Sequence, residues 1–125
     1  MERDYVRVLA FEDGADIALL LANGGIEFSA LTIEQRWRTD DAVDIIKEFA
    51  PDILLLDHYI PPTKGLDVLR ELNQAVSQGE LTRPSTIVGM SSLQAANEKM
   101  LLEGADIGIV KPQIASLPIW PKRES

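Results

Sequence analysis

Short apolar segments of strand length recur along the chain. Four of them are clear: residues 5–11, 52–57, 85–90 and 106–110. Aliphatic runs of this length are typical of parallel strands that are buried on both faces. The pattern is least regular in residues 26–38, and we place a fifth strand within residues 26–33.

Amphipathic segments lie between these strands. Apolar residues recur at helical spacing in residues 15–21, 42–49, 66–76 and 93–100, which predicts four helices. Thr39, Asp40 or Asp41 is the expected cap of the second helix. Ser91 or Ser92 is expected to begin the last of the four. Strands alternating with helices predict an α/β fold, in which right-handed βαβ units surround a parallel sheet.

Length, charge and composition narrow the class of protein. A chain of 125 residues predicts one domain over residues 1–125. The net charge of -8 disfavours nucleic acid as a partner. Without cysteine the chain forms neither a disulfide nor a zinc–thiolate site. Glu2, Arg3 and Asp4 interrupt any signal peptide, and no apolar run is long enough for a bilayer. We therefore expect a cytoplasmic protein that binds neither nucleic acid nor membrane.

Polar residues follow the predicted strands at the points where those strands end. In a parallel α/β sheet, functional sites form beyond the carboxyl ends of the strands. That rule selects Glu12, Asp13, Asp57, Ser91 and Lys111.

Clustered carboxylates repel one another, and a bound Mg²⁺ relieves that repulsion through hard oxygen ligands. A carboxylate also acts as a nucleophile and forms an acyl phosphate, while a lysine neutralises charge on the transferring phosphoryl group. Asp13 and Asp57 are candidate direct ligands of Mg²⁺, with Glu12 holding a water. Lys111 is the candidate lysine, and Ser91 can donate a hydrogen bond to a phosphoryl oxygen.

Several motifs along the chain resemble those of one known family. They are FEDGADI (11–17), LLLDHYIPPTKGLDVLREL (54–72), IVGMSS (87–92), GAD (104–106) and VKP (110–112). Their order and spacing resemble those of CheY-like receiver domains of two-component response regulators. The block after Asp57 is the most specific, since Pro61 and Gly65 fall at the family's offsets. The resemblance implies a flavodoxin-like, doubly wound parallel sheet of five strands in the order 2-1-3-4-5.

The resemblance also implies roles for individual residues. Asp57 would be the phosphoacceptor, Glu12 and Asp13 the acidic pair, and the backbone carbonyl of Tyr59 a further Mg²⁺ ligand. A histidine kinase or histidine phosphotransfer protein would supply the phosphoryl group.

Two further positions of the family's motif are present. Ser91 stands at the family's Ser/Thr position, and Lys111 stands at that of its lysine. A cis peptide bond is expected before Pro112, as is usual in the family.

Three departures from the family concern how phosphorylation would be transmitted. Gly108 stands where the family usually carries an aromatic ring, and the segment 91–104 is about two residues shorter than usual. Pro118 and Pro121 shorten the last helix to about one turn within residues 113–117. We expect Ile119 and Trp120 to cover the sheet in its place.

Some residues near these motifs have plainer explanations. Ser91 is as well suited to capping a helix as to contacting phosphate. His58 should point away from Asp57, because neighbouring strand residues face opposite sides. Tyr59 is expected to shield the phosphate from water. Trp37 and Trp120 are expected to pack in partly buried positions.

Three functions compete. The leading one is a phosphoacceptor response regulator that signals through protein contacts as a monomer or weak dimer, and that catalyses nothing beyond its own phosphorylation and dephosphorylation. The second is a pseudo-receiver-like interaction module whose binding is independent of phosphate, as Gly108 and the short tail suggest. The third is an enzyme of haloacid-dehalogenase type, which needs a second aspartate where Tyr59 stands.

Overall fold

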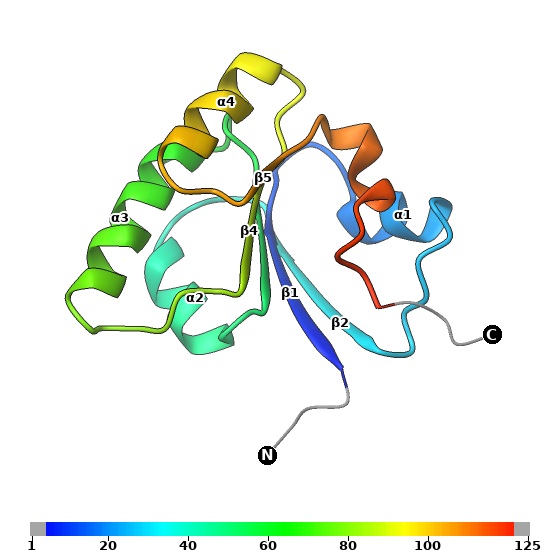
Figure 1. Cartoon of the computed structure of the whole chain (residues 1–125), viewed down its shortest axis with the longest axis horizontal. Helices are drawn as coiled ribbons and strands as arrows, with labels where there is room; N and C mark the ends of the chain where they lie inside the picture. The colour runs from blue at the N-terminus through cyan, green and yellow to red at the C-terminus, as the bar shows by residue number, and fades with distance from the viewer. Residues whose placement is uncertain (1–4, 122–125) are drawn as a thin grey trace.

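A parallel five-stranded sheet organises the computed structural model, which describes residues 5–121 (Figure 1). Its strand order is β2-β1-β3-β4-β5, which confirms the predicted topology. The strands are β1 Val6–Phe11, β2 Leu31–Arg36, β3 Ile53–Leu56, β4 Thr86–Gly89 and β5 Ile107–Gly108. The helices are α1 Ile17–Asn23, α2 Ala42–Phe49, α3 Gly65–Ser77, α4 Gln94–Leu102 and the 3₁₀ helix η1 Lys111–Ser116. No helix in the described part of the chain has the length and apolar character needed to cross a bilayer.

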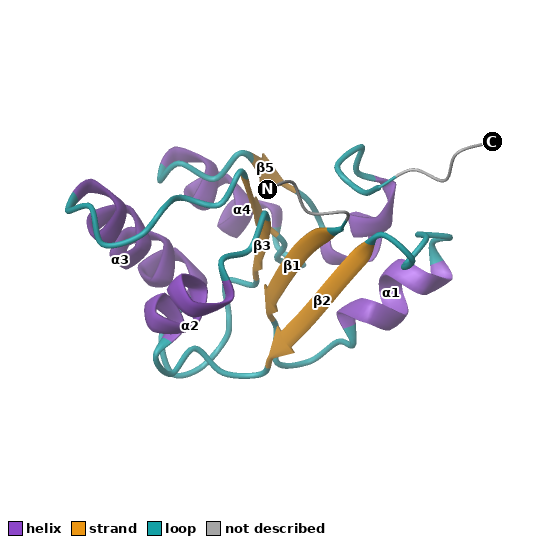
Figure 2. Cartoon of the chain, turned by 90° about the horizontal axis from the view of Figure 1, so that it is seen from below, coloured by secondary structure: helices purple, strands orange, loops and turns teal. Residues whose placement is uncertain are grey.

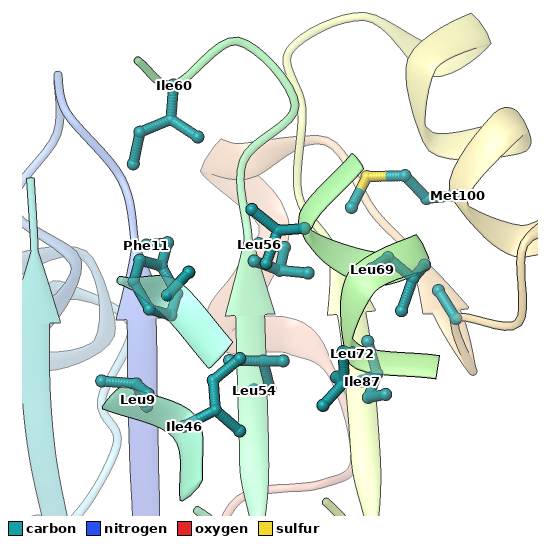
Figure 3. Packing of buried hydrophobic residues seen from close by; sticks show 13 residues of the cluster. Leu9, Phe11, Ile46, Leu54, Leu56, Ile60, Leu69, Leu72, Ile87 and Met100 are labelled. Atoms are coloured by element: carbon teal, nitrogen blue, oxygen red, sulfur yellow. The ribbon is translucent and has the colours of Figure 1, made fainter. Parts of the chain in front are cut away.

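Helices cover both faces of the sheet. α2, α3 and α4 lie on one face, whereas α1 and η1 lie on the other (Figures 1 and 2). Alternation along β1 serves both layers: Leu9 and Phe11 join the cluster under α2–α4 (Figure 3), while Val8 and Ala10 join the cluster under α1 and η1. Successive strand residues face opposite sides, so an almost uninterrupted apolar strand builds two cores at once.

The strand register brings the loop residues together at one edge. Phe11 pairs with Leu56, Leu56 with Gly89, and Gly89 with Gly108. Four strands therefore end level with one another, and the residues that follow them share the edge formed by the carboxyl ends of the strands.

The second strand differs from its prediction. It occupies Leu31–Arg36 rather than residues 26–33. Ile26 donates its backbone N–H to the carbonyl of Leu21, and Leu31 donates to that of Phe28, so the segment before the strand is a turn. Ile26 and Phe28 pack against the core under α1. Their apolar character therefore comes from core packing, although it resembled the pattern of a buried strand.

The cap of α2 is one of the three residues expected. Asp41 is the N-cap of α2 but makes no side-chain capping bond. The Thr39 hydroxyl instead accepts from the Thr63 N–H at 2.8 Å and donates to the Thr63 carbonyl at 2.7 Å. Thr39 thereby joins the loop after β2 to the loop after β3.

The start of α4 was predicted at Ser91 or Ser92, and that prediction is wrong. The N-cap is Leu93. Ser91 Oγ accepts from the Leu93 N–H at 3.1 Å, so the serine orders the turn before the helix. Gly104 follows the helix in a left-handed conformation with φ of 112°, as expected for a residue just past a helix end.

The chain after β5 forms a short tail in place of a full helix. η1 is a single short 3₁₀ segment, in agreement with the predicted shortening. Trp120 is buried in the core under α1 and donates its indole N–H to the Ile114 carbonyl at 3.0 Å. Ile119 packs against the same core. The expectation that these residues cover the sheet is confirmed.

The expected cis bond before Pro112 is wrong. The cis bond found among residues 5–121 is Pro61–Pro62. The chain enters η1 directly at Lys111, and Pro112 lies in its first turn, where a fixed φ and a missing N–H are tolerated.

Replacing Trp120 by Ala should destabilise the protein by about 3–5 kcal/mol, because a large buried ring and its hydrogen bond are lost. The matched control is Trp37→Ala. Trp37 is 51% exposed, so its loss should cost less than about 1 kcal/mol. Urea unfolding of the two variants gives the comparison. Equal losses would show that the tail does not support the core.

Candidate functional site

Three carboxyl groups meet at the edge formed by the strand ends. Glu12 and Asp13 follow β1, and Asp57 follows β3. One carboxyl oxygen from each lies within 4.8 Å of those from the other two. Glu12 and Asp57 are buried, at 0% and 4% exposed, whereas Asp13 is exposed. The structure thus brings together the acids that the sequence selected, with one open to solvent.

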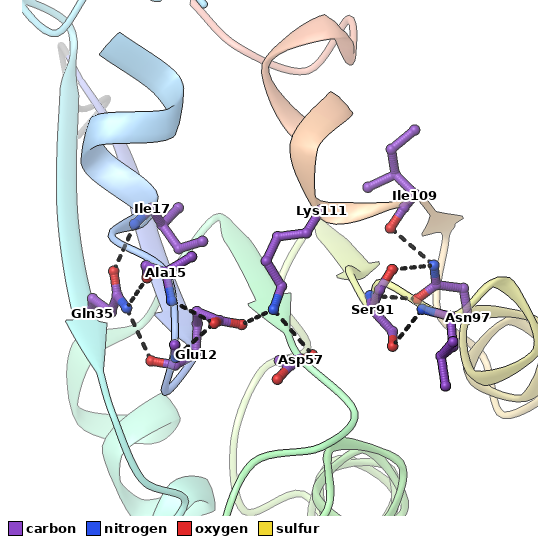
Figure 4. A network of polar contacts seen from close by, with 11 residues as sticks. Glu12, Ala15, Ile17, Gln35, Asp57, Ser91, Asn97, Ile109 and Lys111 are labelled. Atoms are coloured by element: carbon purple, nitrogen blue, oxygen red, sulfur yellow. Dashed lines mark hydrogen bonds and ion pairs between the residues drawn. The ribbon is translucent and has the colours of Figure 1, made fainter. Parts of the chain in front are cut away.

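Lys111 lies between the two buried acids (Figure 4). Its Nζ is 2.7 Å from Glu12 Oε1 and 3.7 Å from Asp57 Oδ1. Lys111 reaches this position from the first residue of η1, directly beyond β5. One ammonium group cannot neutralise three ionised carboxylates, so the cluster retains an excess of negative charge.

The backbone of the loop after β1 fixes Glu12. Its Oε2 accepts from the N–H groups of Gly14 and Ala15, both at 2.8 Å. Oε2 is therefore held by the loop, while Oε1 faces Lys111.

Gln35 at the end of β2 supports this loop, and the sequence analysis missed it. Its Nε2 donates to the carbonyls of Glu12 at 2.9 Å and Ala15 at 2.8 Å, and its Oε1 accepts from the Ile17 N–H at 2.9 Å. A polar residue at a strand end would have been selected by the same rule as Asp57. The predicted strand, however, ended at residue 33, two residues before Gln35.

Burial and neighbouring charge raise the pKa of Asp57 from 3.8 to about 6. The largest cause is desolvation, followed by the negative charge of Glu12. Lys111 lowers the pKa, and Asp13 raises it. Ionisation of Asp57 is therefore less favourable than that of an ordinary aspartate, and added positive charge would offset the difference.

The donor set suits Mg²⁺. This ion prefers carboxylate oxygens, usually one or two of them, and keeps several waters. The exposed Asp13 beside the buried Asp57 provides such oxygens with access to solvent. The proposed ligand role of the Tyr59 carbonyl stays a prediction.

Gly65 sets the backbone position of Asp57. It donates its N–H to the His58 carbonyl at 3.0 Å. A Cβ at position 65 would lie 2.1 Å from the Asp57 carbonyl oxygen, far inside van der Waals contact. Only glycine allows the first turn of α3 to pack this closely under the loop, which gives a physical reason for its fixed offset from Asp57.

Ser91 is buried at the end of β4, at 1% exposed. Its N–H donates to Asn97 Oδ1 at 2.7 Å, and its hydroxyl accepts from the Leu93 N–H. Asn97 is a second residue that the sequence analysis missed. It lies within the predicted last helix, where a polar residue is ordinarily assigned to solvent.

The residues after Asp57 differ in exposure. His58 is 7% exposed, and burial lowers its pKa, helped by the charges of Lys64 and Lys99. Its Nδ1 has no hydrogen-bond partner among the described residues. These charged neighbours lie at α3 and α4, in keeping with a ring that faces away from the carboxylates. Tyr59 is 53% exposed, and its ring lies edge-on to the His58 ring with 4.5 Å between the two ring centroids.

Trp37 corrects an expectation. It was expected to be partly buried but is 51% exposed. It directly follows β2, which ends at Arg36, and so lies beyond the sheet rather than over it.

Asp57→Asn should stabilise the Mg²⁺-free protein at about pH 7.5. Since the folded carboxyl has a raised pKa, its favourable contribution is complete below about pH 4 and is lost as the pH rises through about 6. The neutral amide avoids this loss, so the gain at pH 7.5 should be on the order of 1–3 kcal/mol and should vanish near pH 4. Urea unfolding across this range measures it. The exposed Asp44→Asn serves as the control, and an equal gain there would contradict the account.

Comparison with known proteins gives related sequences and folds. No family model matches the chain. A protein-glutamate methylesterase/protein-glutamine glutaminase of Yersinia pseudotuberculosis is 32% identical over 116 residues, covering 87% of this chain and 31% of that protein. The protein of the same description from Escherichia coli K12 is 35% identical over 77 residues, covering 58% of this chain and 20% of that protein. The chain thus spans less than a third of the length of these curated relatives.

Solved structures share the fold. The BeF3-activated N-terminal receiver domain of Klebsiella pneumoniae RstA is 26% identical, with a TM-score of 0.65 over 84% of this chain and 85% of that one. A CheY-like receiver domain from Methylobacillus flagellatus is 20% identical, with a TM-score of 0.70 over 90% and 91%. The response regulator domain of Thermotoga maritima CheB is 22% identical, with a TM-score of 0.65 over 92% and 84%. Sequence and fold together place this chain among the CheY-like receiver domains of response regulators.

Proposed function

We propose that this receiver domain accepts a phosphoryl group on Asp57 from the phosphohistidine of a histidine kinase or histidine phosphotransfer protein. The observation that carries the proposal is the cluster of three carboxyl groups with Lys111 at the strand ends of a receiver fold. The domain then signals through changed contacts with another protein.

The transfer is a displacement at phosphorus. A carboxylate oxygen of Asp57 forms a bond to the phosphorus of the donor, and the P–N bond to the donor imidazole breaks. The electron pair of that bond remains on the imidazole nitrogen, which takes up a proton. The product is an acyl phosphate on Asp57, so only the ionised carboxylate can begin the reaction.

Residues of the cluster would bind Mg²⁺ during this transfer. Asp13 and Asp57, with the Tyr59 carbonyl, are the proposed ligands, and Glu12 would hold a metal-bound water. When bound, Mg²⁺ supplies positive charge that offsets the carboxylates and the phosphoryl oxygens. Asp57, whose pKa stands at about 6 without the ion, is largely ionised at neutral pH, and bound Mg²⁺ would lower that pKa and extend the ionised form to lower pH.

Lys111 and Ser91 would contact the phosphoryl oxygens. The ammonium group of Lys111, 3.7 Å from Asp57 Oδ1, is a flexible point charge that can move from Glu12 to a phosphoryl oxygen. The Ser91 hydroxyl accepts one hydrogen bond, from Leu93, and so retains its own O–H to donate. Both groups would stabilise charge in the transition state.

A phosphate-independent interaction module is the second candidate. Its support is the packing at Gly108, where an added Cβ would lie 3.1 Å from Asn97 Cβ and 3.3 Å from Leu101 Cδ1. No room is left there for an aromatic ring that changes position on phosphorylation. The complete acidic cluster favours the phosphoacceptor, because a module that only binds partners has no need of it.

Wild-type protein incubated with acetyl phosphate and Mg²⁺ should gain one phosphoryl group per chain, measured by intact mass or by a phosphate-affinity gel. Asp57→Asn should gain none, because it lacks the nucleophile. Lys111→Met should be slowed by about 10²-fold or more, since one charge that stabilises the transition state is lost. The exposed Asp44→Asn should behave as the wild type.

Equal labelling of Asp57→Asn, or no labelling of the folded wild type, would contradict the proposal. In the second case, partner binding that is unaffected by Asp57→Asn would favour the interaction module.

A further inference from the structure

Asn97 connects two parts of the structure that surround the strand ends. It is buried, at 3% exposed, although it lies on α4. Its Oδ1 accepts from the Ser91 N–H at 2.7 Å. Its Nδ2 donates to the Ser91 carbonyl at 3.1 Å and to the Ile109 carbonyl at 2.9 Å. One amide therefore bonds the loop after β4 on one side and the chain leaving β5 on the other (Figure 4).

These bonds use the whole hydrogen-bonding capacity of the amide nitrogen. Nδ2 has two hydrogens, and each has a carbonyl partner. Leaving a buried polar group without its partner costs about 1–3 kcal/mol. When Ser91 is displaced, Asn97 must therefore follow it or break bonds at a substantial cost.

Gly108 permits this arrangement. A Cβ there would come within 3.1 Å of Asn97 Cβ and within 3.3 Å of Leu101 Cδ1. Asn97 and Leu101 thus occupy the volume that a side chain at position 108 would need. The buried amide of Asn97 on α4 can therefore pack against β5 only because position 108 has no side chain.

We propose that Asn97 is a positioning residue that couples Ser91 to β5 and α4, so that a phosphoryl group on Asp57 changes the fit between α4 and β5. This inference rests on the proposed phosphoryl transfer and adds the route by which it is transmitted. The Ser91 hydroxyl turns toward a phosphoryl oxygen, and the Ser91 backbone moves with it. The paired amide of Asn97 carries that displacement to Ile109 and to its own helix.

The displacement would appear at a groove on the outer side of Asn97. The groove has a volume of about 260 Å³ and lies between α4, β5 and η1, where Leu101, Gly108, Ile109 and Gln113 contribute to its lining. Leu101 is 42% exposed, and Ile109 is half-buried. The methyl groups of Leu101 are therefore probes of the groove beside the amide. Those of Ile109, which pack against the core under α1 and η1, are probes of the β5 end to which the amide is bonded, and both lie outside the phosphoryl site.

The test measures separately whether a phosphoryl mimic binds at Asp57 and whether its binding changes the groove. Beryllofluoride with Mg²⁺ is the phosphoryl mimic, and its bound ¹⁹F resonance reports occupancy of Asp57. The methyl resonances of Leu101 report the groove, and those of Ile109 report the chain leaving β5. Asn97→Asp retains the acceptor for the Ser91 N–H but removes both donated bonds. Asn97→Ser is a neutral variant, too short to bridge the two carbonyls, and it covers the case in which a buried carboxylate unfolds the chain.

Asn73→Asp is the matched control. Asn73 on α3 donates its amide to the Glu103 carbonyl at 2.7 Å and so also joins two elements. This hydrogen bond involves neither Ser91 nor β5. A general effect of losing an inter-element amide would therefore appear in this variant too.

In the wild type and Asn73→Asp, beryllofluoride should bind and both methyl resonances should shift. In Asn97→Asp and Asn97→Ser it should still bind, but the shift at Ile109 and Leu101 should be lost. Full shifts in folded Asn97 variants would overturn the coupling role. Binding without any methyl shift in the wild type would overturn it while leaving the phosphoacceptor function intact. No bound ¹⁹F resonance in the wild type would refute the phosphoacceptor function, and the coupling with it.

Discussion

The convergence of negative charge at one edge of the sheet is the constraint on which the structure depends. Parallel strands that end level with one another force Glu12, Asp13 and Asp57 together, and two of these acids are buried. Lys111 supplies one compensating charge. The fold thus holds the carboxylates close together despite their repulsion, and added positive charge would reduce that repulsion. Such an excess of negative charge is what a cation-binding site requires.

Neighbouring parts of the fold hold this arrangement in place. Gln35 fixes the loop that carries the first two acids, and Gly65 lets α3 pack against the carbonyl of Asp57. On the far side, Asn97 joins the loop after β4 to β5. The tail uses Trp120 to complete the core that a longer last helix would cover. Departures from the usual family pattern thus lie in the packing around β5 and in the tail, whereas the three acids and Lys111 are brought together at the edge.

The sequence was sufficient to predict most of the strands and the acidic edge, because aliphatic runs depend on local pattern and strand-end residues on one general rule. The order of the strands came from the resemblance to receiver domains. It was insufficient where tertiary contacts decide. Ile26 and Phe28 are apolar because they pack against the core from the segment before β2. For this reason β2 was predicted too early in the chain, and Gln35 was not selected. Asn97 is polar yet buried, since its partners are backbone groups from distant segments. The exposure of Trp37 likewise depends on where β2 ends, and the local sequence pattern did not predict that end.

The central claim is that burial and neighbouring negative charge raise the pKa of Asp57 and that a bound cation lowers it. The most direct test is the carboxyl ¹³C NMR titration of Asp57 in the folded protein, with and without Mg²⁺. The account predicts a pKa of about 6 in the absence of Mg²⁺ and a clear decrease when Mg²⁺ is added. An ordinary aspartate pKa near 4 that Mg²⁺ does not change would contradict it.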